Sequence, residues 1–257
     1  MTRKKTRISG EEFVGKILNG ERDFSNIYLE KNFDLNGNDA FTELQEYLRS
    51  PGYNSDLELR GATLIGLKAN GIYLPYLNAP FAKIYHSQFS GAHLPKTNLC
   101  GSVLTGSNFN FAKLWNADLS KTRLERTQFK EAELNEANLA EAVCRGTNFR
   151  KAELVGVNLT KSRLISGDFS YADLRDADLS EAYIYVIHST DRRTLFKETD
   201  LTGVKGLESV FIGKKEDLGQ ARIDRKEIKL TMVPDLYNGK ETGVYHVRYN
   251  FIGGERK

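Results

Sequence analysis

Phenylalanine recurs every twenty residues through the middle of this chain, and this spacing constrains the fold more than any other feature. The series is Phe89, Phe109, Phe129, Phe149 and Phe169. Between these positions an apolar residue stands at every fifth place, as in Leu94, Leu99 and Leu104. A period of five inside a period of twenty fits neither an α-helix nor a simple strand, so it indicates a repeat protein. Four five-residue sides then form one square coil, and equivalent residues of successive coils stack.

Two residues of each five-residue unit are expected to point into the coil: the large central residue and a small residue two positions before it. On the phenylalanine side these small residues are Ser87, Ser107, Thr127, Thr147 and Gly167, which leave room for the rings. Inward hydroxyl groups can bond to the backbone. The predicted structural core therefore consists of the five phenylalanines and a second stacked series, Leu94, Leu114, Leu134, Leu154 and Leu174.

The residue before the central leucine is often Asp or Asn, as in Ala117-Asp118-Leu119 and Ala172-Asp173-Leu174. Short polar side chains that bond neighbouring backbone suit tight corners. This pattern resembles the motif of the pentapeptide-repeat family over about residues 55–187, with fragments near 23–29 and 194–201. The resemblance implies an all-β solenoid, a right-handed quadrilateral β-helix whose coils rise by one strand spacing of about 4.8 Å.

Two short helices are expected near the N-terminus. Ser9 and Glu12 fit a capping box, which predicts a helix over residues 9–19 that covers the first coil. Asn38-Asp39 fits the start of a second helix, about residues 39–50, inserted in the repeats and packed on one side of them.

The C-terminal part departs from the repeat pattern. Alternating apolar residues on both sides of Pro234-Asp235 and Asn238-Gly239 predict a β-hairpin with a long loop. Because this part differs most from the repeats, we expect it to carry partner specificity. The predicted domains are a capping segment 1–20, a repeat region 21–204 that is most regular over 82–187, and a C-terminal extension 205–257.

Composition excludes several protein classes. The net charge of +3 is too small to indicate nucleic-acid binding by itself, and no apolar run approaches the length of a membrane span. The basic N-terminus is not followed by an apolar segment, so no signal peptide is expected and the predicted location is the cytoplasm. Of the two cysteines, Cys144 takes an inward position and Cys100 an outward one, so they are not expected to pair.

Catalysis finds little support in the sequence. The four histidines show no metal-ligand spacing, and no nucleophile elbow, phosphate-binding glycine loop or pair of catalytic carboxylates is present. The predicted function is therefore a non-enzymatic protein–protein interaction scaffold with no cofactor or metal. Its partner is another protein of unknown identity, and homodimer formation stays open.

Six outward residues are candidates for partner binding. Three are aromatic, Phe111, Trp115 and Tyr171, and either form a binding patch or are covered by the inserted helix or the C-terminal segment. Three are basic, Arg123, Arg126 and Arg145, and could contact phosphate. Neighbouring glutamates dilute this basic cluster, so nucleic-acid binding is not favoured.

The family resemblance also implies an alternative function. Its best-known members are quinolone-resistance proteins, acidic rods that mimic DNA and bind gyrase. Here residues 82–187 carry 13 Lys and Arg against 12 Asp and Glu, a near balance that argues against a strongly acidic mimic. One outward series even alternates in sign, Lys121, Glu141, Lys161 and Glu181, which favours pairing between neighbouring coils.

Overall fold

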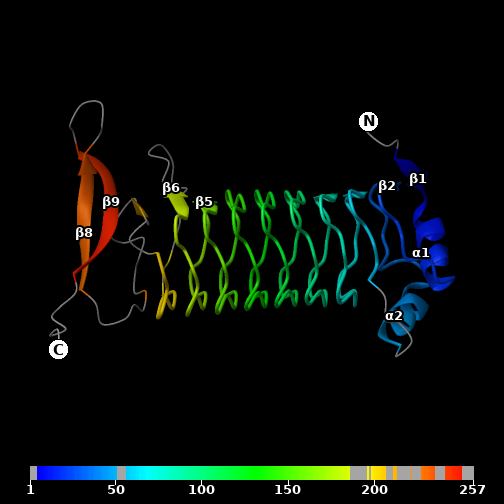
Figure 1. Ribbon diagram of the computed structural model, residues 1–257. Helices are drawn as coiled ribbons and strands as arrows, with labels where there is room; N and C mark the ends of the chain where they lie inside the picture. Colours follow the sequence, from blue (N-terminus) through cyan, green and yellow to red (C-terminus); the bar gives the residue numbers. More distant parts are fainter. Residues whose placement is uncertain are drawn as a thin grey trace.

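The chain forms a right-handed quadrilateral β-helix, seen from the side in the computed structural model of Figure 1. The structure describes residues 5–50, 56–185, 196, 198–206, 211–212, 221, 227–234 and 241–250. We name the four sides of the coil after one inward residue each: the phenylalanine side, the Leu94 side, the Leu99 side and the Leu104 side. The chain visits them in this order, so the Leu94 and Leu104 sides lie opposite each other.

Successive coils are joined by parallel backbone hydrogen bonds at a spacing of twenty residues. The Leu114 N–H donates to the Glu133 carbonyl at 2.7 Å, and the Glu133 N–H donates to the Ala112 carbonyl at 2.9 Å. Most of these contacts are single bridges. Longer pairings occur on the Leu104 side, where the strands are β1 (Thr6–Ile8), β2 (Ile27–Leu29), β3 (Thr63–Ile65), β4 (Lys83–Tyr85), β5 (Arg163–Ile165) and β6 (Tyr183–Tyr185).

The phenylalanine series forms a continuous stack inside the rod. Ring centroids of successive coils lie 4.9–5.4 Å apart from Phe89 to Phe169. The stack continues to Phe196 at 5.3 Å, so the repeat fragment near residues 194–201 forms a partial final coil. All ten residues of the predicted core are buried, and Leu94, Leu114, Leu134, Leu154 and Leu174 line the next side.

The inward hydroxyls on the phenylalanine side bond to the backbone, as the sequence predicts. Ser107, Thr127 and Thr147 each donate to a backbone carbonyl of the preceding coil, at 2.8–2.9 Å. The Asp and Asn residues before the central leucine stabilise the corners, since the Asp118 carboxylate accepts from the Ser120 N–H at 2.9 Å. Each corner also holds a residue with positive φ, and these residues project outward, as Lys121 does at 58°.

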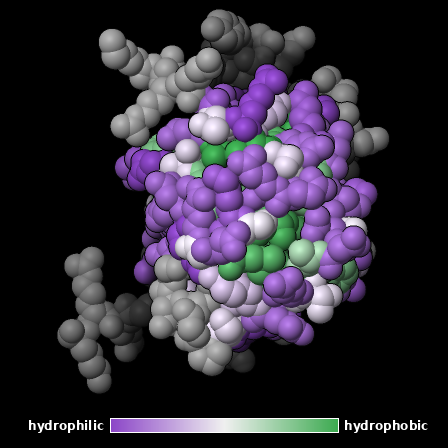
Figure 2. Space-filling view, turned by 90° about the vertical axis from the view of Figure 1, so that its right-hand side faces the viewer, coloured by the Kyte–Doolittle hydropathy of each residue, from purple (hydrophilic) through white to green (hydrophobic). Residues whose placement is uncertain are grey.

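The N-terminal end of the rod is closed by two helices. Helix α1 (Gly10–Leu18) begins at Ser9, whose Oγ accepts from the Glu12 N–H at 3.1 Å, as the capping box predicts. Its Phe13 ring packs edge-on against Phe24 of the first coil at 4.8 Å. When the rod is viewed from this N-terminal end, its surface is mostly hydrophilic, and hydrophobic residues are visible between the polar ones (Figure 2).

Helix α2 (Phe41–Arg49) is the inserted helix that the sequence predicts, but its position differs from the prediction. It follows Leu35, which is buried under the phenylalanine side, and it stands where the Leu94 side of the first coil would be. It therefore lies beside α1 at the end of the rod (Figure 1) and does not pack along a side. Its buried residues, Leu44 and Leu48, complete the closure.

Two further features go beyond the sequence prediction at the ends. Strand β1 pairs in parallel with β2, so the capping segment contains a strand as well as the expected helix. At the other end, β8 (Glu227–Pro234) and β9 (Glu241–Asn250) form the predicted antiparallel hairpin, and β7 (Phe211–Ile212) adds a third strand beside β9.

The cysteines follow the prediction: Cys144 is buried, Cys100 is half-buried, and both are free. Burial raises the pKa of the Cys144 thiol well above its usual value, which makes this thiol unreactive. Over the described ranges, neither helix has the length and apolar character needed to cross a membrane.

Candidate functional site

The six candidate binding residues do not form one site. Trp115 lies on the Leu94 side, with Phe111 and Tyr171 along the corner between that side and the phenylalanine side. The three arginines lie on the Leu104 side or at its corner, across the rod from Trp115. The aromatic and the basic candidates are therefore two separate surfaces.

The basic cluster is weaker than its sequence suggests. Arg123 donates two hydrogen bonds to Glu125, at 3.0 and 3.1 Å, and the Thr105 hydroxyl donates to the same carboxylate at 3.1 Å. Burial opposes ionisation of Glu125, but these hydrogen bonds hold the pKa of its carboxyl below the usual value. Arg123 is therefore already paired with Glu125 on the same surface.

The Leu94 side carries a larger surface than the sequence analysis recognised. Around Trp115 and Phe111, the three coils nearest α2 present aromatic, proline and lysine side chains. Tyr76 and Phe111 are each 50% exposed, among the most exposed large apolar side chains of the described residues. We call this surface the aromatic-basic half; it comprises Tyr73, Pro75, Tyr76, His93, Lys96, Phe111, Lys113 and Trp115, with Pro95 buried beneath it.

Contacts within the aromatic-basic half hold its rings in place. Tyr73 and His93 stack at 4.9 Å with an interplanar angle of 18°. The Arg49 guanidinium of α2 lies 5.5 Å from the Tyr73 ring, and the Lys96 ammonium lies 5.6 Å from the Tyr76 ring. Such contacts hold aromatic side chains in place, and Tyr76 still stays 50% exposed, which suits recognition by a rigid surface.

Helix α2 reaches only the edge of this surface. Gln45 accepts from the Tyr73 N–H at 3.2 Å, and Arg49 contacts the same residue. Phe111 nevertheless stays half exposed, so the interpretation that the inserted helix covers it is wrong. The other covering segment, the C-terminal extension, lies largely outside the described residues.

His93 is the most unusual polar group of the aromatic-basic half. Its Nδ1 is buried and has no hydrogen-bond partner among the described residues. Burial lowers the pKa of His93, and the positive charge of Lys113 adds to the effect. In the described part of the chain no group of three or more His, Cys, Asp or Glu residues is arranged to hold a metal ion.

Beyond Lys113 the same side becomes acidic. Lys113 and Glu133 form an ion pair at 3.4 Å, and this pair marks the boundary. Within the acidic part, Arg175 binds Asp173 at 2.6 Å, and this hydrogen bond lowers the pKa of the Asp173 carboxyl. We call this surface the acidic half; its carboxylates are Glu133, Glu136, Glu153, Asp173, Asp176 and Asp200.

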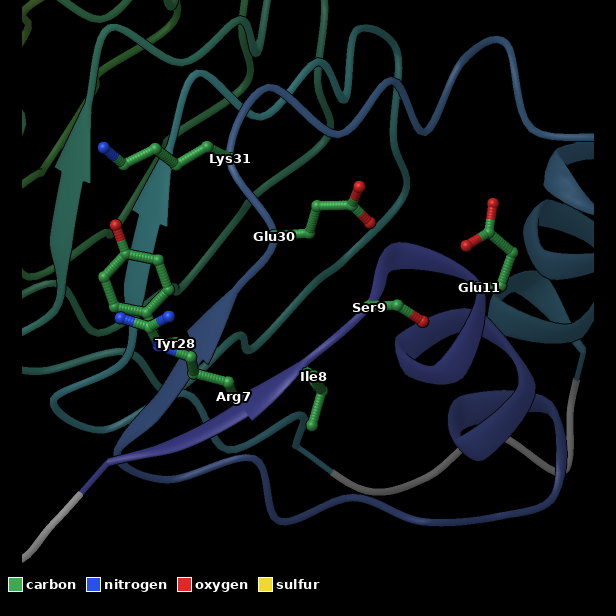
Figure 3. Close-up of a pocket in the computed structure, with 7 residues that line it drawn as sticks. All are labelled: Arg7, Ile8, Ser9, Glu11, Tyr28, Glu30 and Lys31. Atoms are coloured by element: carbon green, nitrogen blue, oxygen red, sulfur yellow. The ribbon is translucent and has the colours of Figure 1, made fainter.

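A hollow of about 620 Å³ opens at the N-terminal end, between β1, α1 and the segment that contains β2 (Figure 3). Two of its charged groups, Glu30 and Arg7, already have structural contacts. Glu30 accepts from the Gly10 N–H at 3.0 Å, and the Arg7 guanidinium lies 5.4 Å from the Tyr28 ring. A carboxylate at a helix N-terminus stabilises the helix, so we assign these residues to the cap. The sequence pattern gave no signal for this hollow.

The repeats were compared with known proteins. The family model described as pentapeptide repeats matches in eight copies, over residues 82–120, 107–143, 127–164 and 142–181. Comparison with curated protein sequences gives no match.

Solved structures that are similar to this chain include three pentapeptide-repeat proteins. QnrB1, a plasmid-mediated fluoroquinolone resistance protein, is 18% identical with a TM-score of 0.48, covering 65% of this chain and 82% of its own. HetL, from the cyanobacterium Nostoc sp. strain PCC 7120, is 19% identical with a TM-score of 0.22, covering 84% and 94%. AT2G44920, from the Arabidopsis thaliana thylakoid lumen, is 31% identical with a TM-score of 0.22, covering 34% and 63%.

Proposed function

We propose that this chain, a pentapeptide-repeat protein, acts without catalysis as a rigid scaffold that binds another protein through its Leu94 side. The observation that carries the proposal is the aromatic-basic half. Tyr76 and Phe111 are half exposed on a backbone held by hydrogen bonds between coils, and the half-buried Trp115 lies in the same coil as Phe111. Aromatic anchors held in place before binding lose little conformational entropy, and they dominate the energetics of many protein interfaces.

The charged residues on the opposite corner of the rod contrast with this side. On the corner between the Leu99 and Leu104 sides, ion pairs link neighbouring coils, such as Lys121 with Glu141 at 3.8 Å. Exposed pairs of this kind keep a surface hydrated and contribute little energy. The aromatic-basic half instead places several aromatic rings in neighbouring coils of one side, which is typical of binding surfaces.

Purification of binding partners tests this proposal. Full-length protein carrying Phe111→Ala and Trp115→Ala is expected to lose a partner that the unchanged protein retains. Phe81→Ala is the matched control, because Phe81 is also an exposed corner residue with positive φ, on the opposite edge of the rod. Equal recovery of the partner with all three proteins would refute the assignment to the Leu94 side.

A second candidate function is binding to a topoisomerase such as gyrase by mimicry of DNA. One observation favours it: the carboxylates Glu133, Glu153, Asp173 and Asp200 follow one another at single-coil steps. Lysines and arginines nearby reduce this field, since Arg175 binds Asp173. A DNA supercoiling assay separates the two functions, because only the mimic is expected to inhibit gyrase at micromolar protein.

A further inference from the structure

We propose that the Leu94 side binds a second copy of this chain, with the two rods antiparallel and related by a two-fold axis between the coils of Lys113 and Glu133. The inference rests on the proposed function in taking this side as the interaction surface, and it goes further by naming the partner. It is carried by the order of charges and shapes along the side.

The charge on the Leu94 side changes from positive to negative near the middle of the rod. One outward column, linked coil to coil by parallel bridges, reads Tyr73, His93, Lys113, Glu133, Glu153, Asp173 and Asp200. A two-fold interface brings the same patch of both subunits together. When a second copy lies antiparallel on this column, its lysine therefore meets a carboxylate, and its histidine and tyrosine meet the next two carboxylates.

The repeat geometry fixes which residues face each other. With the axis in the contact plane and perpendicular to the rods, each column meets itself in reverse. Lys113 then faces Glu133 of the second copy, and Glu133 faces its Lys113. One coil further out, His93 faces Glu153 of the second copy. Both copies make the same contacts, so the arrangement closes as a dimer and does not extend into a filament.

Shape complements charge along the neighbouring corner. Gly71 and Gly91 lie in the corner column of Phe111, and a Cβ added to either would meet no atom within 4 Å. These two glycines leave a gap beside the Tyr73–His93 stack. In the antiparallel register they face Tyr171 and Lys151 of the second copy, so large side chains meet the gap.

The size of the side limits the strength of the dimer. Six coils at about 4.8 Å give a length of about 29 Å, and five residues at about 3.3 Å give a width of about 17 Å. Two such faces bury on the order of 1,000 Å², which lies at the lower limit of specific interfaces. We therefore expect a reversible dimer whose population rises with protein concentration.

Sedimentation analysis of charge-reversal variants tests the inference. The unchanged protein is expected to shift from monomer to dimer with rising concentration. Lys113→Glu opposes two carboxylates across the interface, and Glu133→Lys opposes two ammonium groups, so each variant is expected to dimerise at least tenfold more weakly. An equal mixture of the two variants restores opposite charges in the heterodimer. We expect the mixture to dimerise like the unchanged protein.

The matched control uses a similar ion pair on another edge of the rod. Lys121 and Glu141 are also one coil apart and lie 3.8 Å from each other, at the corner between the Leu99 and Leu104 sides. Lys121→Glu and Glu141→Lys are expected to leave dimerisation unchanged. Because mixing leaves each variant's own fold unaltered, recovery in the Lys113→Glu and Glu133→Lys mixture reports the interface alone.

Three results would overturn the inference: an unchanged protein that stays monomeric up to millimolar concentration, a mixture that fails to recover, or equal weakening by the control pair. If the protein is monomeric but Phe111→Ala with Trp115→Ala abolishes binding of a different protein, the dimer is rejected and the scaffold function is retained. If the protein is monomeric and these substitutions also leave partner binding unchanged, both the dimer and the scaffold function are rejected.

Discussion

The phenylalanine stack and the Leu94 side occupy the same coils but follow opposite rules. Inside, one ring type repeats from Phe89 to Phe169 with centroids 4.9–5.4 Å apart. Outside, the column that begins at Tyr73 changes from aromatic to basic to acidic over the same length. Interior residues must fill a fixed volume at crystal-like density, so they resist variation. Outward residues have no such constraint, so their order is free to encode a partner.

The largest expected effect lies on the interior side of this comparison. Phe129→Ala should lower the free energy of unfolding by about 3–5 kcal/mol, because the ladder of coils prevents its neighbours from filling the space. Phe129 is fully buried between Phe109 and Phe149, at centroid distances of 5.4 and 5.3 Å. Denaturant unfolding measures the change, and an unfolding midpoint equal to that of the unchanged protein would contradict the role of the stack.

A smaller effect is expected from the inward hydroxyls, and the chain offers a matched pair. The Ser107 Oγ donates to the Ile84 carbonyl at 2.9 Å and accepts from the Ser87 N–H at 3.1 Å. Ser107→Ala should therefore cost about 1 kcal/mol or somewhat more. Ser162 takes an equivalent inward position, but its buried Oγ has no hydrogen-bond partner among the described residues. Ser162→Ala should be neutral or stabilising, and equal losses in both variants would show that the hydrogen bonds do not matter.

The smallest expected effect is the contribution of His93, on the outer surface, to the pH dependence of stability. His93 has a lowered pKa in the folded chain, so the unfolded chain binds its proton more readily. Its contribution to stability is complete above the unfolded pKa of about 6.5 and is lost as the pH falls through that value towards the folded one. The melting temperature of the unchanged protein should thus fall more steeply between about pH 8 and pH 5 than that of His93→Gln. Parallel curves for the two proteins would exclude this role.

The interior of the rod could be predicted almost completely from the sequence. A twenty-residue period assigns a side and a coil to each inward position, and Phe196 and Leu201 show that the assignment holds beyond the most regular part. The candidate site was predicted less well. The same grid, extended back from Phe111 and Trp115, would have placed His93, Tyr73 and Tyr76 on one surface. The coil of the two tyrosines lacks the phenylalanine marker, because Ala69 stands in its place.

The sequence by itself determined the square coil, its core, the capping helix at Ser9 and the terminal hairpin. These depend on local spacing and on contacts repeated at one fixed interval, which a pattern records directly. Only the tertiary structure decided where α2 stands, that β1 pairs with β2, and that Gln45 and Arg49 reach Tyr73. Each of these contacts joins two segments whose separation in the sequence is not repeated elsewhere in the chain. The repeat pattern therefore does not reveal them.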